Sequence, residues 1–192
     1  MDEKKFDLKK LQKLNNPQRL IDIPPDYVWG KLNIEEPGVF VDIGNGTAFF
    51  SVAFLQKSKS STIYACDSSE VMINWVKENI FPEYPNIIPV KTEEYSVPLD
   101  DGVADLVFMI NLHHELDNPT LTLEECNRIL KPDGKIFVVD WKKQDMPEGP
   151  PAKIRFLPEQ VKEQLVNTGF KQVEIYNELQ NHFLVVGANN QT

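Results

Sequence analysis

The sequence predicts an α/β fold, a three-layer sandwich around a seven-stranded, mostly parallel sheet whose last strand is antiparallel. Three observations predict it. From Val39 onwards, short apolar runs alternate with amphipathic segments, which is typical of parallel strands joined by helices. A glycine-rich turn directly follows the first apolar run. The last two runs, 170–176 and 181–187, are joined by a short turn, which favours an antiparallel pair.

Composition restricts the class of protein. The chain has 192 residues, of which 41% are hydrophobic, enough for a single domain with one sizeable core. A net charge of −9 gives no positive field to attract a phosphate backbone, so nucleic acid is not an expected partner. No apolar run approaches the roughly 18 to 20 residues of a membrane span, and the chain does not start with a secretory leader. We therefore expect a cytoplasmic protein, with Cys66 and Cys126 as buried thiols.

The region before the first strand, residues 1–35, is predicted to form an N-terminal helical cap. An amphipathic helix over 4–14 ends at an Asn-Asn-Pro turn. A second helix begins at Pro24, where a missing N–H costs nothing, and runs to about Leu32. Residues 36–192 are expected to form the rest of a single globular domain.

The glycine-rich turn is the strongest local signal. The strand 39–43 contains Asp42 and leads into Gly44 and Gly46, which lack a β-carbon and let a ligand approach the backbone beside a helix N-terminus. A dinucleotide site requires a third glycine where Phe49 stands. Together with the acid two residues before the first glycine, this favours a ligand without phosphates.

Two motifs carry a family resemblance. Asp42-Ile43-Gly44-Asn45-Gly46-Thr47-Ala48 resembles the first motif of the class I S-adenosylmethionine-dependent methyltransferases, in the group that includes the ubiquinone and menaquinone methyltransferases. Ala48 replaces the last glycine of that motif. Residues 128–134 resemble the family's Arg-x-Leu-Lys-Pro-Gly-Gly, a fold marker. The resemblance covers about 39–186 and implies a Rossmann-like methyltransferase domain within 36–192.

The second strand, 62–66, delivers Asp67, which lies 21 residues after Gly46. A carboxylate at this spacing can accept both ribose hydroxyl protons of a nucleoside cofactor. The alternative is that Asp67 and Ser68 only cap a helix. The resemblance implies that Ser68 opens the next helix and that Met72 faces the adenosine.

The resemblance implies further contacts to S-adenosylmethionine. Glu93 matches the acid that contacts the adenine amine and Glu94 would supply a backbone N–H, although a solvated acidic loop also explains both. Asn111 would lie beside the sulfonium and the amino-acid end. The predicted cofactor-binding residues are Asp42, Gly44, Asn45, Gly46, Asp67, Ser68, Met72, Glu93, Glu94 and Asn111.

The adjacent histidines His113 and His114 suggest a metal site, but neighbours in sequence diverge and no third ligand has a useful spacing, so no metal is predicted. A structural role in the loop and a proton-accepting or substrate-contacting role for His113 or His114 both stay open. The irregular stretch 141–157 is expected to form a wall or lid for the acceptor, or a stiff solvated loop. Its basic edge consists of Lys142, Lys143, Lys153 and Arg155.

The predicted function is therefore an S-adenosylmethionine-dependent methyltransferase that transfers a methyl group to a small-molecule or lipid-like acceptor and leaves S-adenosylhomocysteine. No catalytic residue is assigned, because the sulfonium already makes the methyl group electrophilic. Ala48 and Glu93 motivate one alternative, a cofactor-binding regulatory module without turnover. The other alternative is an NAD(P)-dependent oxidoreductase, which Phe49 disfavours. The acceptor and the oligomeric state stay open.

Overall fold

The computed structural model describes residues 8–189, with side chains from Leu11 onwards. One seven-stranded sheet has the order β3-β2-β1-β4-β5-β7-β6. Its strands are β1 (Val39–Ile43), β2 (Thr62–Asp67), β3 (Ile87–Lys91), β4 (Ala104–Ile110), β5 (Leu130–Trp141), β6 (Lys171–Tyr176) and β7 (His182–Ala188). The last strand, β7, pairs antiparallel with β5 and β6, and the other neighbours pair parallel. The predicted α/β sandwich is confirmed.

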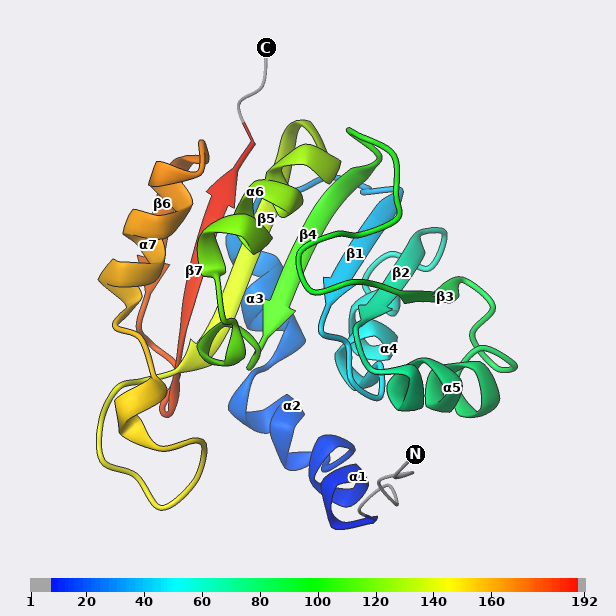
Figure 1. The fold of residues 1–192 in the computed structure, drawn as a ribbon, viewed down its shortest axis with the longest axis horizontal. Helices are drawn as coiled ribbons and strands as arrows, with labels where there is room; N and C mark the ends of the chain where they lie inside the picture. Colours follow the sequence, from blue (N-terminus) through cyan, green and yellow to red (C-terminus); the bar gives the residue numbers. More distant parts are fainter. Residues whose placement is uncertain (1–7, 190–192) are drawn as a thin grey trace.

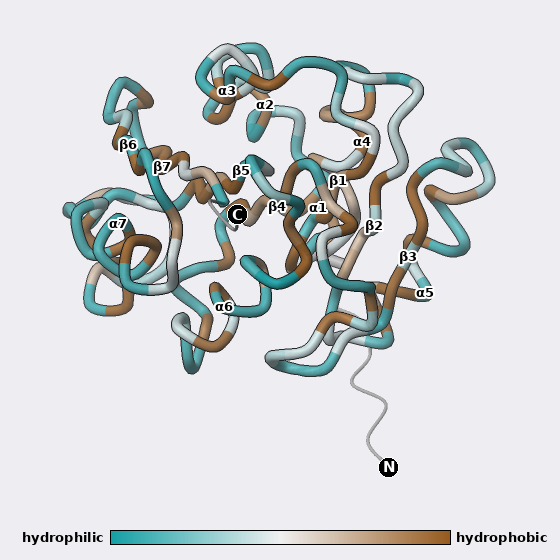
Figure 2. The backbone as a smooth tube through the Cα atoms, turned by 90° about the horizontal axis from the view of Figure 1, so that it is seen from above, coloured by the Kyte–Doolittle hydropathy of each residue, from teal (hydrophilic) through white to brown (hydrophobic). Residues whose placement is uncertain are grey.

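Helices cover both faces of the sheet. The helices of the described residues are α1 (Leu8–Leu14), α2 (Gln18–Asp22), α3 (Pro25–Leu32), α4 (Phe49–Leu55), α5 (Glu70–Asn79), α6 (Pro119–Ile129) and α7 (Pro158–Asn167), with 3₁₀ turns η1 (His113–Glu115) and η2 (Ala152–Ile154). Seen from above, α3 and α4 lie on one side of the sheet and α6 and α7 on the other (Figure 2). None of the helices within 8–189 is long and apolar enough to cross a membrane.

Each face of the sheet has its own apolar core. Under α4, the rings of Phe54, Phe108 and Phe137 meet at centroid distances of 5.0 to 5.3 Å. Under α6 and α7, Leu123 and Leu165 pack against the opposite face. Each fully buried apolar side chain contributes about 1.5–3 kcal/mol. Because both faces are covered, the strands consist of nearly continuous apolar runs, which made them predictable.

The carboxyl ends of the parallel strands form one edge of the sheet. Figure 1 shows α1 and α2 lying beyond this edge, next to the ends of β1 and β4. The strand order reverses between β1 and β4, since β2 and β3 follow on one side of β1 and β4 and β5 on the other. Ligands of open α/β sheets bind in the crevice at such a switch point.

Some boundaries differ from those expected. The five-residue helix α2 was not predicted, because a segment this short carries no periodic pattern. Helix α5 begins at Glu70 with Ser69 as its N-cap, so Ser68 does not open it. Strand β5 starts at Leu130, whose pairing with Ala104 precedes a register shift.

The two parts of the chain meet in the core. Val28 and Leu32 of α3 are buried among the side chains under α4. The division into a cap of residues 1–35 and a domain of residues 36–192 stays a prediction. The expected first helix, 4–14, is seen as α1, and its first residues lie outside the described part of the chain.

Candidate cofactor site

A cavity of about 1060 Å³ opens at the carboxyl ends of β1 and β4, and residues of α1 and α2 line it, among them Leu14 and Arg19. Every predicted cofactor-binding residue lines it, namely Asp42, Gly44, Asn45, Gly46, Asp67, Ser68, Met72, Glu93, Glu94 and Asn111. These residues come from four separate stretches of sequence, and each stretch lies at or just beyond a strand end. Their contacts to a cofactor stay predictions.

The glycine-rich loop forms the floor of this cavity. Its Gly44, Gly46 and Ala48 all have left-handed φ angles, of 68°, 55° and 57°. The N–H groups of Gly44 and Asn45 both donate to the carbonyl oxygen of Cys66, at 2.8 and 3.1 Å. For Ala48 this conformation costs about 1–2 kcal/mol, which explains why the family motif has glycine there.

We expect Gly44→Ala to destabilise the protein by about 1–3 kcal/mol, because a side chain is strained at this φ. The new β-carbon would also lie 2.6 Å from the side chain of Leu112. Gly46→Ala is the matched control, since its β-carbon would meet Leu14 at an ordinary 3.7 Å. Urea unfolding measures both variants. Equal losses in the two would show that the clash with Leu112 contributes nothing.

The carboxylate of Asp67 joins the loop to the start of α5. Its Oδ2 accepts the N–H of Gly46 at 3.0 Å, and its Oδ1 accepts the N–H of Ser69 at 2.8 Å. Asp67 therefore holds Ser69, the N-cap residue of α5, in place, and it also faces the cavity. Neither Asp67 nor Ser68 caps the helix, since its N-cap is Ser69, whose side chain forms no capping hydrogen bond.

Asp42 is a buried acid at the end of β1. Its side chain accepts a hydrogen bond from the hydroxyl of Ser51 at 2.5 Å and is only 4% exposed. Burial raises the pKa of Asp42 to about 7; the hydrogen bond from Ser51 and the charge of Arg19 oppose this, while Asp67 adds to it. A nearby positive ligand would favour the ionised carboxylate.

The cavity wall is rich in hydrogen-bond acceptors. The side-chain oxygens of Asn45 and Asn111 are buried and have no hydrogen-bond partner among the described residues. The carboxylates of Asp42 and Asp67 lie on the same wall. Because buried acceptors without donors cost free energy, this wall fits a ligand that is positively charged and carries N–H and O–H groups.

The remaining predicted residues differ in exposure. Met72 of α5 is buried at the cavity, whereas Ser68, Glu93 and Glu94 lie exposed at its rim. The carboxylate of Glu94 accepts a hydrogen bond from the hydroxyl of Tyr95 at 2.7 Å. The explanation of a solvated acidic loop thus stays open for the two glutamates.

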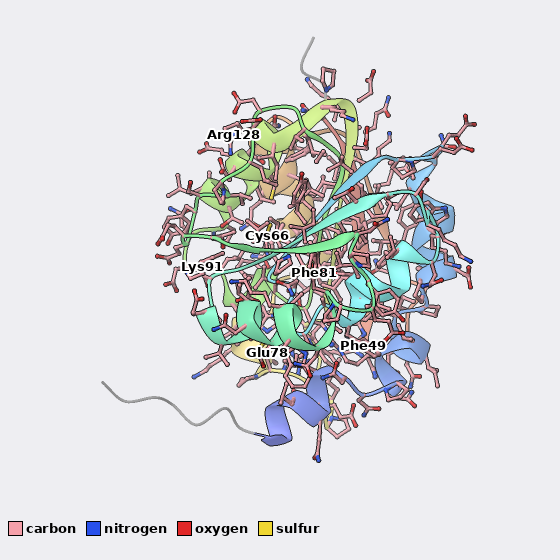
Figure 3. All side chains as sticks on the ribbon, turned by 90° about the vertical axis from the view of Figure 1, so that its right-hand side faces the viewer. Phe49, Cys66, Glu78, Phe81, Lys91 and Arg128 are labelled. Atoms are coloured by element: carbon pink, nitrogen blue, oxygen red, sulfur yellow. The ribbon has the colours of Figure 1, made fainter. Side chains whose placement is uncertain are left out.

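Sequence reasoning missed Arg19, whose helix α2 was not predicted. Its guanidinium lies over the rings of Phe49 and Phe50, at 5.6 and 4.7 Å from their centroids. Phe50 lines the cavity, and Phe49 lies where α4 meets the N-terminal helices (Figure 3). Arg19 itself faces the cavity, and burial lowers the pKa of its guanidinium.

The two adjacent histidines diverge, as expected. His113 is fully buried against the ring of Phe156, and this burial lowers its pKa to about 4. His114 lines the cavity, with its Nδ1 2.8 Å from Oδ1 of Asp140. Burial alone would lower the pKa of His114, but hydrogen bonds to Asp140 and Glu115 outweigh burial and raise it to about 9. His113 is thus buried outside the cavity lining, whereas His114 lines the cavity.

The stretch 142–157 is a folded wall of the cavity, with Glu148, Gly149 and Pro150 lining it. Arg155 is only 4% exposed, so the prediction that it belongs to a basic edge is wrong. Its guanidinium donates to the carbonyl oxygens of Lys142, Gln144, Glu148 and Pro150, at 2.7 to 3.1 Å. A buried arginine therefore fixes the shape of this loop from within.

Comparisons with known proteins agree with this geometry. Residues 41–138 match the family model described as a methyltransferase domain. The crystal structure of an S-adenosylmethionine-dependent methyltransferase from Aquifex aeolicus is 31% identical, covering 96% of this chain and 100% of that chain, with a TM-score of 0.87. This chain belongs to the S-adenosylmethionine-dependent methyltransferases. The resemblance stated from the two motifs is confirmed, and S-adenosylmethionine is the cofactor of this methyltransferase.

Two curated relatives carry more specific names. The malonyl-[acyl-carrier protein] O-methyltransferase of Geobacter sulfurreducens is 23% identical over 74% of this chain and 59% of its own length. The demethylmenaquinone methyltransferase of Staphylococcus aureus is 27% identical over 72% of this chain and 58% of its own length. The methyltransferase thus spans less than two thirds of the length of either relative.

Proposed function

We propose that this methyltransferase transfers a methyl group from S-adenosylmethionine to a small-molecule or lipid-like acceptor. The observation that carries the proposal is the acceptor-rich cavity at the switch point between β1 and β4. A cationic nucleoside offers a positive charge to the carboxylates of Asp42 and Asp67 on this wall. It also offers donors to the amide oxygens of Asn45 and Asn111, which have none among the described residues.

When bound, S-adenosylmethionine supplies a methyl group that is already electrophilic. The chain has to hold the acceptor in line and exclude water. Asp42 and Asn111 would hold the charged end, Asp67 the ribose and Met72 the adenosine, while Glu93 and Glu94 would meet the adenine at the rim. The wall formed by 142–157 would enclose the acceptor on the β5 side.

The acceptor class has two supports. Apolar side chains share the cavity with the polar ones, among them Ile23, Phe50, Ile110 and Leu116. The relatives include a demethylmenaquinone methyltransferase and a malonyl-[acyl-carrier protein] O-methyltransferase. With a net charge of −9, the chain has no general attraction for nucleic acid.

Calorimetry with S-adenosylhomocysteine tests cofactor binding directly. Folded protein that gives no binding heat at high ligand concentration would contradict the proposal. A regulatory module without turnover, which the left-handed Ala48 motivates, would bind S-adenosylhomocysteine but methylate no compound of a broad acceptor panel.

We expect Asp67→Ala to weaken S-adenosylhomocysteine binding by about 1–3 kcal/mol, through the loss of charge-assisted hydrogen bonds. Asp105→Ala is the matched control, because Asp105 also accepts two backbone N–H groups, those of Gly38 and Val39. It lies at the opposite end of β4, away from the cavity. The control should lower stability in urea and leave affinity unchanged. An unaltered affinity of the Asp67 variant would place the ribose elsewhere.

A further inference from the structure

The cavity extends beyond the glycine-rich loop toward the β5–β7 side of the sheet. Three aromatic or imidazole rings line this part of the cavity, each at the end of a neighbouring strand. They belong to His114 just after β4, Trp141 at the end of β5 and His182 at the start of β7. Trp141 and His182 are paired across the two strands, and their ring centroids are 4.2 Å apart. In the sheet, β4 and β5 lie between β1, which leads into the glycine-rich loop, and β7, which carries His182.

His182 is the unexplained group of this region. Its side chain lines the cavity and is only 1% exposed, yet neither ring nitrogen has a hydrogen-bond partner among the described residues. Buried polar atoms without partners cost free energy, because they have given up hydrogen bonds to water. A polar group of a ligand in the cavity could therefore form the hydrogen bond that the ring nitrogens of His182 lack.

The ionisation of His182 differs from that of His114. Burial lowers the pKa of His182 to about 4, and although the charges of Asp140 and Asp22 raise it, those of Arg19 and Lys142 lower it further. The imidazole is therefore neutral at pH 7, with one N–H donor and one lone pair. His114 is already engaged with Asp140.

The polar group that best fits a neutral imidazole is a hydroxyl, since it can donate to one nitrogen or accept from the other. A carboxylate could use only the N–H donor of the ring. An ammonium group could use only the lone pair. A hydroxyl group must also lose its proton when its oxygen is methylated.

We propose that His182 binds the hydroxyl group of the methyl acceptor and takes its proton during methyl transfer. The inference rests on the proposed function. The acceptor O–H bond breaks and its proton moves to a ring nitrogen of His182, while an oxygen electron pair forms the new O–C bond. The S–C bond of the cofactor breaks, and its electrons stay on sulfur as a neutral thioether. The imidazolium then returns the proton to water, and Asp140 and Asp22 stabilise its charge in the interval.

Phenol serves as a minimal hydroxyl probe and toluene as its isosteric control. Both are titrated into protein saturated with S-adenosylhomocysteine, and the ring signals of carbon-13-labelled histidines are followed by NMR. We expect phenol to bind at least fivefold more tightly than toluene and to move the signal of His182, assigned by its absence in His182→Phe. In that variant, phenol and toluene should bind equally, with S-adenosylhomocysteine affinity within twofold of wild type.

The outcomes separate the two proposals. Failure of the wild type to bind S-adenosylhomocysteine would overturn the proposed function itself. Normal cofactor binding with equal affinities for phenol and toluene would overturn only the role of His182. An unchanged NMR signal of His182 on phenol binding would do the same.

A turnover panel of phenols, alcohols, amines, thiols and carboxylic acids gives a second test. Methylation confined to the amines, thiols and carboxylic acids would also overturn the role of His182. With a hydroxyl acceptor, His182→Gln should lower kcat about 100-fold or more and still bind phenol.

Discussion

Asp42→Asn is expected to stabilise the ligand-free methyltransferase at pH 8, by about 2–4 kcal/mol, and to weaken its binding of S-adenosylhomocysteine. The carboxylate of Asp42 is buried at the end of β1, and burial raises its pKa to about 7 from an ordinary value of 3.8. Each unit of pKa difference between the folded and unfolded chain corresponds to about 1.4 kcal/mol. An asparagine removes the cost of burying this charge and can still accept from Ser51.

The sign of the pH dependence follows from linkage. Between about pH 4 and pH 7, the folded chain keeps a proton on Asp42 that the unfolded chain has released. The contribution of Asp42 to stability therefore falls as pH rises through this range, and it stays low above pH 7. The asparagine variant lacks this dependence.

Urea unfolding of both proteins at pH 5 and pH 8 measures the effect. Other titrating groups, such as His114, contribute equally to both proteins and cancel in the difference between them. The variant should gain stability over wild type between pH 5 and pH 8. A constant difference between the two proteins would show that Asp42 is ionised throughout this range.

If Asp42→Asn loses affinity for the cofactor, that loss would explain why the chain keeps a buried carboxylate at position 42 although it lowers the stability of the ligand-free protein. An acid that costs stability in the empty protein is favourable once a positive ligand lies beside it. We expect Asp42→Asn to weaken S-adenosylhomocysteine binding about 10- to 100-fold by calorimetry, since the amino group of the ligand loses a charged partner. A more stable variant with unchanged affinity would remove Asp42 from the predicted cofactor site.

The residues on the glycine-rich side of the cavity could be predicted from the sequence, because each element there is encoded locally, while their contacts to the cofactor stay predictions. Asp42, Asp67 and Asn111 each stand at or next to the end of an apolar run, and parallel strands bring such ends to one edge. The turn after Asp42 requires left-handed φ angles at positions 44 and 46, and glycine is the residue that adopts them readily. Local patterns were sufficient to predict this wall before its geometry was known.

The acceptor side could not be predicted in the same way. His182 and Trp141 lie 41 residues apart, and they meet only because β7 pairs with β5 in one particular register. That register depends on tertiary packing rather than on a motif. His182 also begins an otherwise apolar strand, where a histidine gives no signal of its own. The buried position of Arg155 depends likewise on how a proline-rich loop folds.

Arg155→Ala is expected to unfold the wall 142–157 locally and to weaken phenol binding more than tenfold, while S-adenosylhomocysteine affinity stays within twofold. The guanidinium is buried and donates to four carbonyl oxygens of this loop. Its removal leaves these oxygens without donors, at a cost of about 1–3 kcal/mol for each one that stays buried. The loop would escape this cost by opening to water.

Two comparisons make the expectation specific to the planar guanidinium. Arg155→Lys keeps the positive charge but offers one compact donor group, which cannot span four carbonyls, so it should behave nearly like alanine. Lys153→Ala, an exposed neighbour in η2, is the matched control and should change neither binding nor stability. Limited proteolysis should cut within 142–157 in both Arg155 variants and spare the control. Arg155 is dispensable if its variants resist cleavage and keep their affinity for phenol. The loop would then hold its shape through Lys142, whose Nζ donates to the carbonyl oxygens of Asn177 and Leu179.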